Sequence, residues 1–419
     1  MKRHLVMTAL MLVATAVCLF SQGALVPDVD TGIKPDLISG RISGFSGLGT
    51  RSGEFLSIPT DARGVALGGA YTASADGLGS VYFNPAGLGF ITGPTFTFTT
   101  INLTLDFQMN HAAGVVTFAD GAMVAGGFAT FLTMDPLEVT TVYRPEGTGD
   151  YFDSYSSVIG GTFAYNISDR FSAGVNLKWV HEDIWDITAN AFGMDIGANY
   201  HTEFLERTVR LGLVIRNLGT NMTFKGNRLY REIDPSRLMD DESPPREITT
   251  KRQTRSPRYG NLRASTFSLP TFLSMGIMYQ VLTREFDGLM VCGDFSQPNN
   301  LDYTFNAGTE YYRVLAEGYR IAGRFGWEFK GDELDHQMQE VKNGEFQFAT
   351  ETYVDEIGQT QTQEVPVMET VDESEILRGL SLGAGFTHEF STFSLNIDYA
   401  YRHTGLLGNW QFVTVSLGF

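Results

Sequence analysis

The sequence predicts an all-β fold, a transmembrane antiparallel β-barrel of about fourteen strands. The composition, a period-two alternation of side chains and the spacing of the long insertions predict it. The chain of 419 residues holds 46 Gly, 31 Phe and 17 Tyr, and charged residues make up only 19% of it, below the usual share of about 25%. Such a composition favours strands over helices. The net charge of −18 argues against nucleic acid as a partner.

The first 24 residues have the layout of a secretory signal peptide. Lys2 and Arg3 form a basic head, Leu5–Phe20 is apolar, and small residues follow. We therefore expect residues 1–24 to be cleaved during export. A retained membrane helix is the alternative, but the apolar run is short and lacks a second basic flank. Residues 25–54 are polar and rich in Gly and Ser, which predicts a flexible leader.

Strand-like alternation begins near residue 94 and continues to the end of the chain. In Asn409–Phe419, the apolar Val413 and Val415 alternate with Thr414 and Ser416, as in a strand with two different faces. The same pattern predicts fourteen strands, at residues 94–107, 110–119, 121–134, 155–165, 171–186, 189–201, 207–217, 266–281, 287–296, 302–313, 318–329, 378–389, 391–402 and 409–419.

Alternation alone fits either a soluble sandwich or a membrane barrel. The strands are about ten or more residues long, as membrane-spanning strands must be, and an even strand count is usual in bacterial barrels. The long gaps at 135–154, 218–265 and 330–377 all follow odd-numbered strands. Since such barrels carry short turns at one end and long loops at the other, the spacing favours the barrel, with these loops outside the cell.

The two longest loops have opposite charge. Residues 218–265 contain ten Lys and Arg against six Asp and Glu, whereas residues 330–377 contain thirteen Asp and Glu against two Lys. One hypothesis is that the loops pair across the mouth of the barrel. The other is that both are solvated surface loops.

Phe55–Leu88 resembles the N-terminal segment of the FadL-like outer-membrane proteins, especially their PorV-like branch. It has Asp-Ala-Arg, a middle rich in Gly and Ala, an acidic residue and then Asn-Pro-Ala. Leu269–Gln280, Asp398–Tyr401 and the terminal Phe419 resemble later parts of the same family. The resemblance implies a barrel at 94–419 in the outer membrane of a diderm bacterium, with residues 55–93 folded into the lumen as a hatch. It also implies that Phe419 is a signal for the outer-membrane assembly machinery.

Four residues of this hatch are predicted to matter most: Asp76, Asn84, Pro85 and Ala86. Pro85 fixes its own φ and biases Asn84 away from helix. The Asn84 amide both donates and accepts hydrogen bonds, so we expect it to tie the hatch to groups of the lumen. The surrounding glycines allow close approach of the chain to the wall.

Several charged residues are predicted by alternation to point into the lumen, where a cation can bind the head group of an amphiphilic anion. The predicted ligand contacts are Lys178, Arg210, Arg216, Arg320 and Arg324. The alternative is that these cations pair with Asp195, Asp294, Glu310, Glu328 and Asp398, since charges away from water are usually paired.

No pattern of an enzyme or of a metal or cofactor site is found. The seven histidines and two cysteines show no metal-ligand spacing, and Cys292 alone remains after removal of the signal peptide. The Gly-rich segment lacks the Lys-Ser/Thr of a phosphate loop, and no Gly-x-Ser-x-Gly elbow occurs. We therefore expect no catalytic residues, no metal and no cofactor.

Two functions remain open from the sequence. The first is a FadL-like channel for hydrophobic or amphiphilic small molecules, such as long-chain fatty acids, gated by the hatch. The alternative is a PorV-like scaffold that binds surface or secreted proteins through its long loops. In both, outer-membrane lipid is an expected partner.

Overall fold

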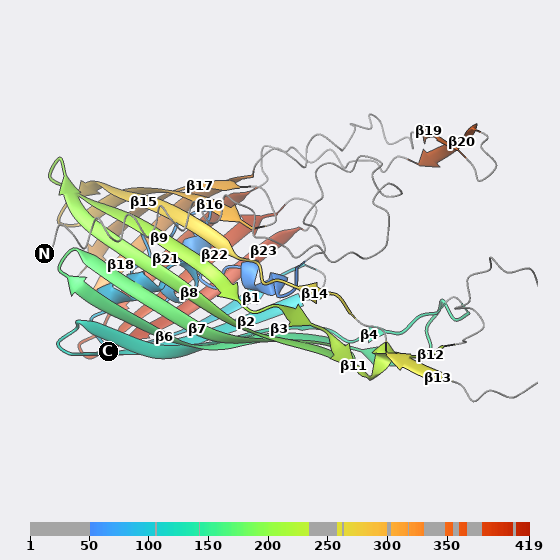
Figure 1. Cartoon of the computed structure of the whole chain (residues 1–419). Helices are drawn as coiled ribbons and strands as arrows, with labels where there is room; N and C mark the ends of the chain where they lie inside the picture. Colours follow the sequence, from blue (N-terminus) through green and yellow to red (C-terminus); the bar gives the residue numbers. More distant parts are fainter. Residues whose placement is uncertain are drawn as a thin grey trace, which may run out of the picture. The chain divides into compact units, whose positions relative to one another are not determined.

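Fourteen long strands form one closed antiparallel barrel (Figure 1). The computed structural model describes residues 51–104, 107–141, 143–233, 258–261, 264–299, 303–316, 318–330, 348–354, 360–366, 379–404 and 408–419. All of them belong to one compact unit, Gly47–Phe419. The predicted signal peptide, most of the predicted leader and most of the two long loops lie outside the described residues. No helix in the described part of the chain is long and apolar enough to cross a membrane.

The barrel strands follow one another around the ring in chain order, apart from short strands that lie outside it. They are β1 (Thr95–Asn102), β2 (Phe107–Phe118), β3 (Met123–Met134), β6 (Ser154–Ser168), β7 (Phe171–Ile184), β8 (Ile187–Phe204), β9 (Arg207–Gly219), β15 (Phe272–Thr283), β16 (Asp287–Pro298), β17 (Thr304–Ala316), β18 (Tyr319–Lys330), β21 (Leu380–Glu389), β22 (Ser394–His403) and β23 (Asn409–Gly418). The ring closes where β1 pairs with β23, with Thr97 opposite Ser416. The predicted count of fourteen antiparallel strands is confirmed.

The links between the strands differ in length at the two ends of the barrel. At one end, called the turn end here, residues 119–122, 169–170, 205–206, 284–286, 317–318 and 390–393 make short connections. The opposite end, called the loop end, carries the three long insertions. This is the arrangement that the spacing of the strands predicts, because every long insertion follows an odd-numbered barrel strand.

Short strands accompany the loop end. They are β4 (Leu137–Glu138), β5 (Tyr151–Phe152), β10 (Met222–Thr223), β11 (Lys225–Gly226), β12 (Tyr230–Ile233), β13 (Arg258–Asn261), β14 (Thr266–Phe267), β19 (Phe348–Val354) and β20 (Thr360–Pro366), with the 3-10 turn η4 (Asn227–Leu229). The predicted start of the strand at residues 266–281 was wrong, because the barrel strand β15 begins at Phe272. Residues 266–267 pair with β10 instead, and Pro270, which has no N–H to donate to a ladder, precedes the barrel strand β15.

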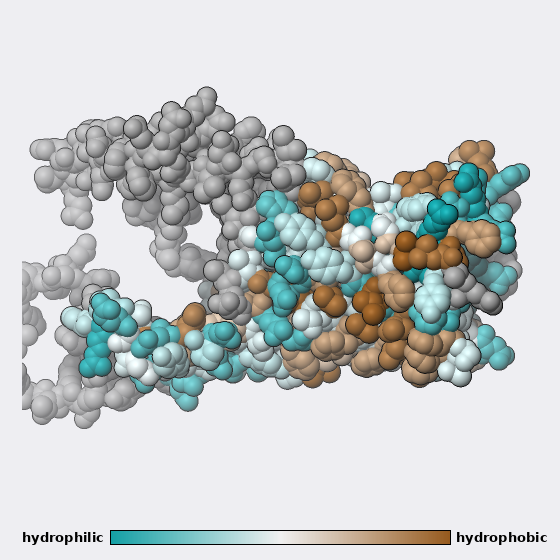
Figure 2. Space-filling view, turned by 180° about the vertical axis from the view of Figure 1, so that it is seen from behind, coloured by the Kyte–Doolittle hydropathy of each residue, from teal (hydrophilic) through white to brown (hydrophobic). Residues whose placement is uncertain are grey.

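The outward face of the barrel is apolar. Leu177 on β7 is 61% exposed and Phe192 on β8 is 67% exposed, whereas inward Phe412 on β23 is fully buried. Figure 2 shows hydrophobic side chains gathered over the barrel wall on the face turned to the viewer, with more hydrophilic side chains toward its two ends. An apolar band between polar ends is the surface of a barrel that sits in lipid.

Residues 51–93 lie inside the barrel and are called the lumen segment here (Figure 1). They form four short helical turns: η2 (Glu54–Ser57), α2 (Ala62–Ala66), α3 (Ser80–Phe83) and η3 (Pro85–Phe90). α2 packs on β18, β21, β22 and β23, while η3 packs on β3, β6, β7 and β8 across the ring. Contacts with opposite sides of the wall place this segment in the lumen.

The lumen segment reaches from one end of the barrel to the other. At the loop end, the Ser52 hydroxyl donates to Glu182 Oε2 at 2.5 Å and the Ser52 amide donates to Ser268 O at 3.2 Å. At the turn end, Asn166 Nδ2 donates to Gly89 O at 2.9 Å. The lumen segment therefore spans the lumen from the loop end to the turn end.

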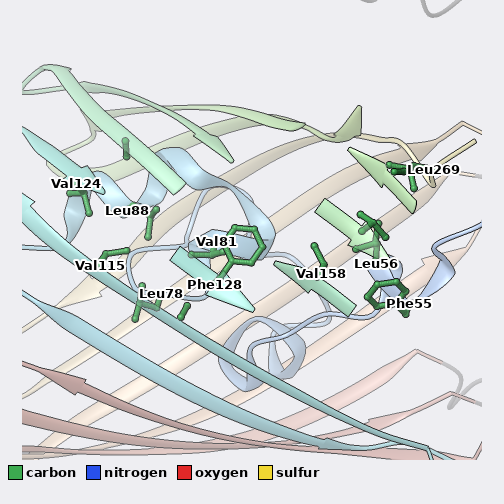
Figure 3. Packing of buried hydrophobic residues seen from close by; sticks show 14 of the residues in the cluster. Phe55, Leu56, Leu78, Val81, Leu88, Val115, Val124, Phe128, Val158 and Leu269 are labelled. Carbon is green, nitrogen blue, oxygen red and sulfur yellow. The ribbon is translucent and has the colours of Figure 1, made fainter. Parts of the chain in front are cut away.

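One side of the lumen wall is apolar. Val81, Leu88 and Phe55 of the lumen segment pack against inward residues of the wall such as Phe128 and Val158 (Figure 3). The expectation of a polar lumen was incomplete, because side chains that face a filled lumen form a packed core rather than a water-filled channel.

Candidate functional site

Asn84 ties the lumen segment together at its central turn. It is fully buried, and its side-chain oxygen accepts the Ala86 amide at 3.1 Å, which caps η3. Its Nδ2 donates to Thr72 O at 2.9 Å and to Ala198 O of β8 at 3.2 Å. Pro85 stands at the first position of η3, where its missing N–H costs nothing. The amide thus joins two parts of the segment to the wall, as its chemistry predicts.

Glycines on the inner wall let the backbone of the lumen segment approach closely. A Cβ at Gly174 or Gly197 would collide with Pro85 or Asn84, and one at Gly326 would collide with the backbone of Leu67 and Gly68. Gly174 and Gly197 face each other on β7 and β8. The central turn of the segment is therefore seated where the wall has no side chains.

A chain of ion pairs fixes the other side of the lumen segment. Arg63 binds Asp76 at 2.5 Å and Glu310 of β17 at 2.8 Å. Glu310 also binds Arg324 at 2.5 Å, and Arg324 binds Asp398 at 2.6 Å. These shared contacts satisfy buried charges that would otherwise be costly. Arg324 is thus part of the wall structure.

Arg210 extends this network toward the turn end. Its Nη1 lies 3.5 Å from Asp76 Oδ2, and its guanidinium lies 4.2 Å from the centre of the Phe90 ring. Phe90 also contacts His201 at a ring separation of 5.7 Å. Arg210 therefore joins the end of the lumen segment to β9.

Lys178 is also paired. Its Nζ lies 2.7 Å from Asp195 Oδ1 and donates to Asn217 Oδ1 at 2.5 Å. Asn176 Nδ2 donates to Asp195 at 2.9 Å and to Val81 O of the lumen segment at 2.8 Å. For Lys178 and Arg324, the alternative of internal pairing with carboxylates describes what the structure contains.

Arg216 on β9 is different. Its guanidinium lies 4.7 Å from the ring centre of Tyr82 and 4.9 Å from that of Phe272. Its Nε and Nη1 are shielded from solvent and have no hydrogen-bond partner among the residues that the structure describes. Buried donors usually have partners, and these two nitrogen atoms are available to bind an acceptor.

A cavity of about 30 Å³ lies beside Arg216, between the lumen segment and the wall. Phe55, Leu56, Val81, Phe128 and Val158 make its apolar part, and Lys178, Asp195, Arg216 and Asn217 its polar part. A second, more open cavity of about 490 Å³ lies at the turn end, lined by Phe90, Asn166, Phe171 and His201. The first cavity therefore combines an apolar surface with a cation, Arg216, for which the described part of the chain supplies no carboxylate partner.

The remaining predicted residues are placed as follows. Ala86 is fully buried, and its carbonyl accepts the Ser172 hydroxyl at 2.9 Å. Arg320 is exposed near the turn end, with its guanidinium 5.3 Å from the Tyr312 ring centre. The Phe419 amide donates to Pro94 O at 2.9 Å, and its side chain is 67% exposed. Arg320 is therefore separate from the cavity that Arg216 lines.

Sequence reasoning missed Arg63, Tyr82 and Asn217. Arg63 follows Asp61 in a stretch of small residues, and an isolated charge in such a stretch is a signal for a buried ion pair. Tyr82 and Asn217 give no such signal, because their positions depend on contacts between distant parts of the chain. No group of three or more His, Cys, Asp or Glu side chains in the described ranges is arranged to hold a metal ion.

No family model and no curated protein matches the chain. Among solved structures, it is similar to a monoaromatic hydrocarbon channel, the TodX deltaS2S3 mutant, with a TM-score of 0.48 and 10% identity over 85% of this chain and 97% of that one. A Pseudomonas aeruginosa FadL homologue gives 0.45 and 11% over 86% and 98%. The Ralstonia pickettii toluene transporter TbuX gives 0.43 and 12% over 85% and 96%. At such low identities, a ligand cannot be transferred from these proteins to this chain.

Proposed function

We propose that this chain is an outer-membrane channel for hydrophobic or amphiphilic small molecules, with long-chain fatty acids as one class of substrate. The predicted signal peptide and the apolar outer band of the barrel support its location. Residues 55–93 act as its hatch. Residues 51–54 precede the hatch and also lie inside the barrel. The resemblance of Phe55–Leu88 to FadL-like proteins supports the same function.

The cavity beside Arg216 carries this proposal. An amphiphilic anion needs an apolar surface for its tail and a donor of matching charge for its head group. Phe55, Leu56 and Phe128 offer the first, and Nε and Nη1 of Arg216 offer the second. Hydrogen bonds from a guanidinium to a carboxylate are among the stronger polar contacts in proteins.

The described state is closed. A cavity of about 30 Å³ has room for roughly two water molecules and cannot hold an alkyl chain. Because Phe55, Leu56 and Ile58 fill the adjoining space, a ligand tail has to displace η2 before it reaches Arg216. Passage therefore requires the hatch to move, at least over residues 51–60.

Uptake of a labelled fatty acid by cells that express the full chain tests this function. We expect uptake above that of cells without the protein, and a severalfold loss in the Arg216→Met variant, because the head group loses the one cation without a carboxylate partner among the described residues that line the cavity. Arg320→Met is the matched control, since Arg320 lies away from the cavity. Equal uptake by cells with and without the protein would refute the proposal.

A further inference from the structure

The wall beside the cavity contains a β-bulge. The pairing of β8 with β9 runs from Met194 opposite Leu218 to Ile196 opposite Ile215. Asp195 alone therefore faces two residues of β9, Arg216 and Asn217. One extra residue on one strand of an antiparallel pair defines a bulge, and bulges redirect side chains.

The bulge reverses the alternation of β9. Before it, the outward residue Leu211 is 45% exposed at an odd position; after it, Leu218 is 43% exposed at an even one. Asn217 between them is only 2% exposed and has a positive φ of 59°. Asn tolerates this left-handed conformation better than most residues. As a result, two successive side chains, Arg216 and Asn217, both line the cavity.

Asp195 holds the bulge in place. Its carboxylate accepts hydrogen bonds from the backbone N–H of Asn217 at 2.7 Å, from Asn176 Nδ2 at 2.9 Å and from Lys178 Nζ at 2.7 Å. The Asn217 side chain in turn donates to Pro270 O at 2.7 Å. At the bulge, the backbone N–H of Asn217 has no partner in the β-ladder. The buried carboxylate of Asp195 satisfies it instead.

The same contacts decide which cation remains free. Asp195 neutralises Lys178, so among the described residues that line the cavity Arg216 is the cation without a carboxylate partner. The rings of Tyr82 and Phe272 flank its guanidinium and limit where its N–H groups can point.

We propose that this bulge sets the head-group specificity of the channel. Asp195 and Asn217 are positioning residues: Arg216 points inward by alternation, and the bulge turns Asn217 inward beside it and fixes where its guanidinium lies at the cavity, so that an anionic head group is preferred over a neutral one. This inference rests on the proposed function and deepens it.

Two substitutions at Asn217 separate the bulge from the side chain. Asn217→Gly keeps a residue that adopts positive φ readily, whereas Asn217→Val introduces a β-branched residue that is strained there. The measurement is the affinity of the purified full chain in detergent for a radiolabelled medium-chain carboxylate and for the primary alcohol of the same length. Unheated gel migration of each variant confirms that its barrel is folded.

We expect the glycine variant to keep the preference of the wild type for the carboxylate within about twofold. The valine variant should lose about tenfold or more in carboxylate affinity, as for a lost charged hydrogen bond, with little change for the alcohol. Equal carboxylate preference in wild type and Asn217→Val would overturn the inference.

These outcomes are distinct from failure of the proposed function. If wild type binds neither probe, or if Arg216→Met binds the carboxylate as wild type does, the assignment of the cavity itself is wrong. If Arg216→Met loses the preference while Asn217→Val keeps it, the cavity binds the anion and only the role of the bulge is refuted.

Discussion

Asn84 shows how much one side chain contributes to the seating of the lumen segment. It was predicted to tie the segment to the lumen because an amide both donates and accepts. The structure adds its partners, Thr72 O and Ala198 O, which no local pattern reveals because Ala198 lies 114 positions further along the chain. The ability of this side chain to donate and accept was predictable from the residue type, but the groups that it contacts were not.

Replacement of Asn84 with Ala should destabilise the folded chain. The change removes the cap of η3 and the donor to the carbonyl groups of Thr72 and Ala198, a loss of about 2 kcal/mol or more. The measurement is the urea midpoint of the fraction that migrates as folded barrel on unheated gels. Asn227→Ala, at an exposed position of η4, is the control and should leave the midpoint unchanged. Identical midpoints for both variants would contradict the role given to Asn84.

Arg216 and Asn217 show where residue-level reasoning failed. Simple alternation places Arg216 inward, which agrees with its place at the cavity, but it places Asn217 outward. The sequence does contain a trace of the bulge, since the apolar positions of β9 change from odd at Leu211 to even at Leu218. Such a change in phase is ambiguous near the end of a strand, where it equally marks the start of a loop.

At the scale of elements, the long strands were predictable and the helical turns were not. A period of two over ten residues is a strong signal, whereas Asp76–Phe90 has four glycines and a proline and favours no regular structure. Its short helices α3 and η3 exist because the side chains of Asn84, Ser172 and Asn176 satisfy their backbone groups. Tertiary contacts therefore supply what local propensity lacks.

The wall glycines provide a test at this scale. Gly326→Ala should displace the lumen segment, because the new Cβ would overlap the backbone of Leu67 and Gly68. Gly323→Ala on the same strand is the control, since nothing lies within 4 Å of a Cβ there. We expect faster cleavage by trypsin at Arg63 in the first variant only. Equal protection in both would show that the segment is not seated against this part of the wall.

For the whole molecule, the closed barrel followed from strand length, strand count and loop spacing. What alternation left undecided was which face meets lipid, because a sandwich and a barrel share the pattern. The filled lumen decides it: inward Phe412 and Thr414 are buried against the lumen segment, while outward Val413 and Val415 are exposed. Side chains of the lumen segment, distant in sequence, complete this core.

Because the outer face of the barrel is apolar, a charged side chain placed on it should destabilise the barrel in lipid. Leu177→Arg places a cation near the middle of β7 on the outer face and should destabilise the barrel in lipid vesicles by about 2–4 kcal/mol. Tyr143→Arg is the control, because Tyr143 is 95% exposed in a loop-end link outside the barrel strands. The urea midpoint in vesicles measures both. No difference between them would contradict a lipid-facing β7.

The central claim is that the hatch must move for a solute to pass, and two reversible locks test it. Ser52→Cys with Glu182→Cys joins the start of the lumen segment to β7 at the loop end through a short dithiol-reactive linker, where the native side chains meet at 2.5 Å. Gly89→Cys with Ser172→Cys places two thiols next to each other at the turn end, where the Cβ atoms would lie 3.1 Å apart. Because a relaxed disulfide has a Cβ–Cβ distance of about 3.5–4.5 Å, the bond requires a small shift of the chain at residue 89. Both variants are built with Cys292→Ala, and each single-cysteine parent is the control.

The deciding measurement is the flux of a labelled fatty acid into vesicles that contain the purified chain, with each lock closed and then released. The account predicts that at least the loop-end lock stops the flux and that release by a cleavable linker restores it. Unchanged flux with both locks closed, alongside flux that depends on the protein, would show that solute passes without movement of the hatch and would contradict the account.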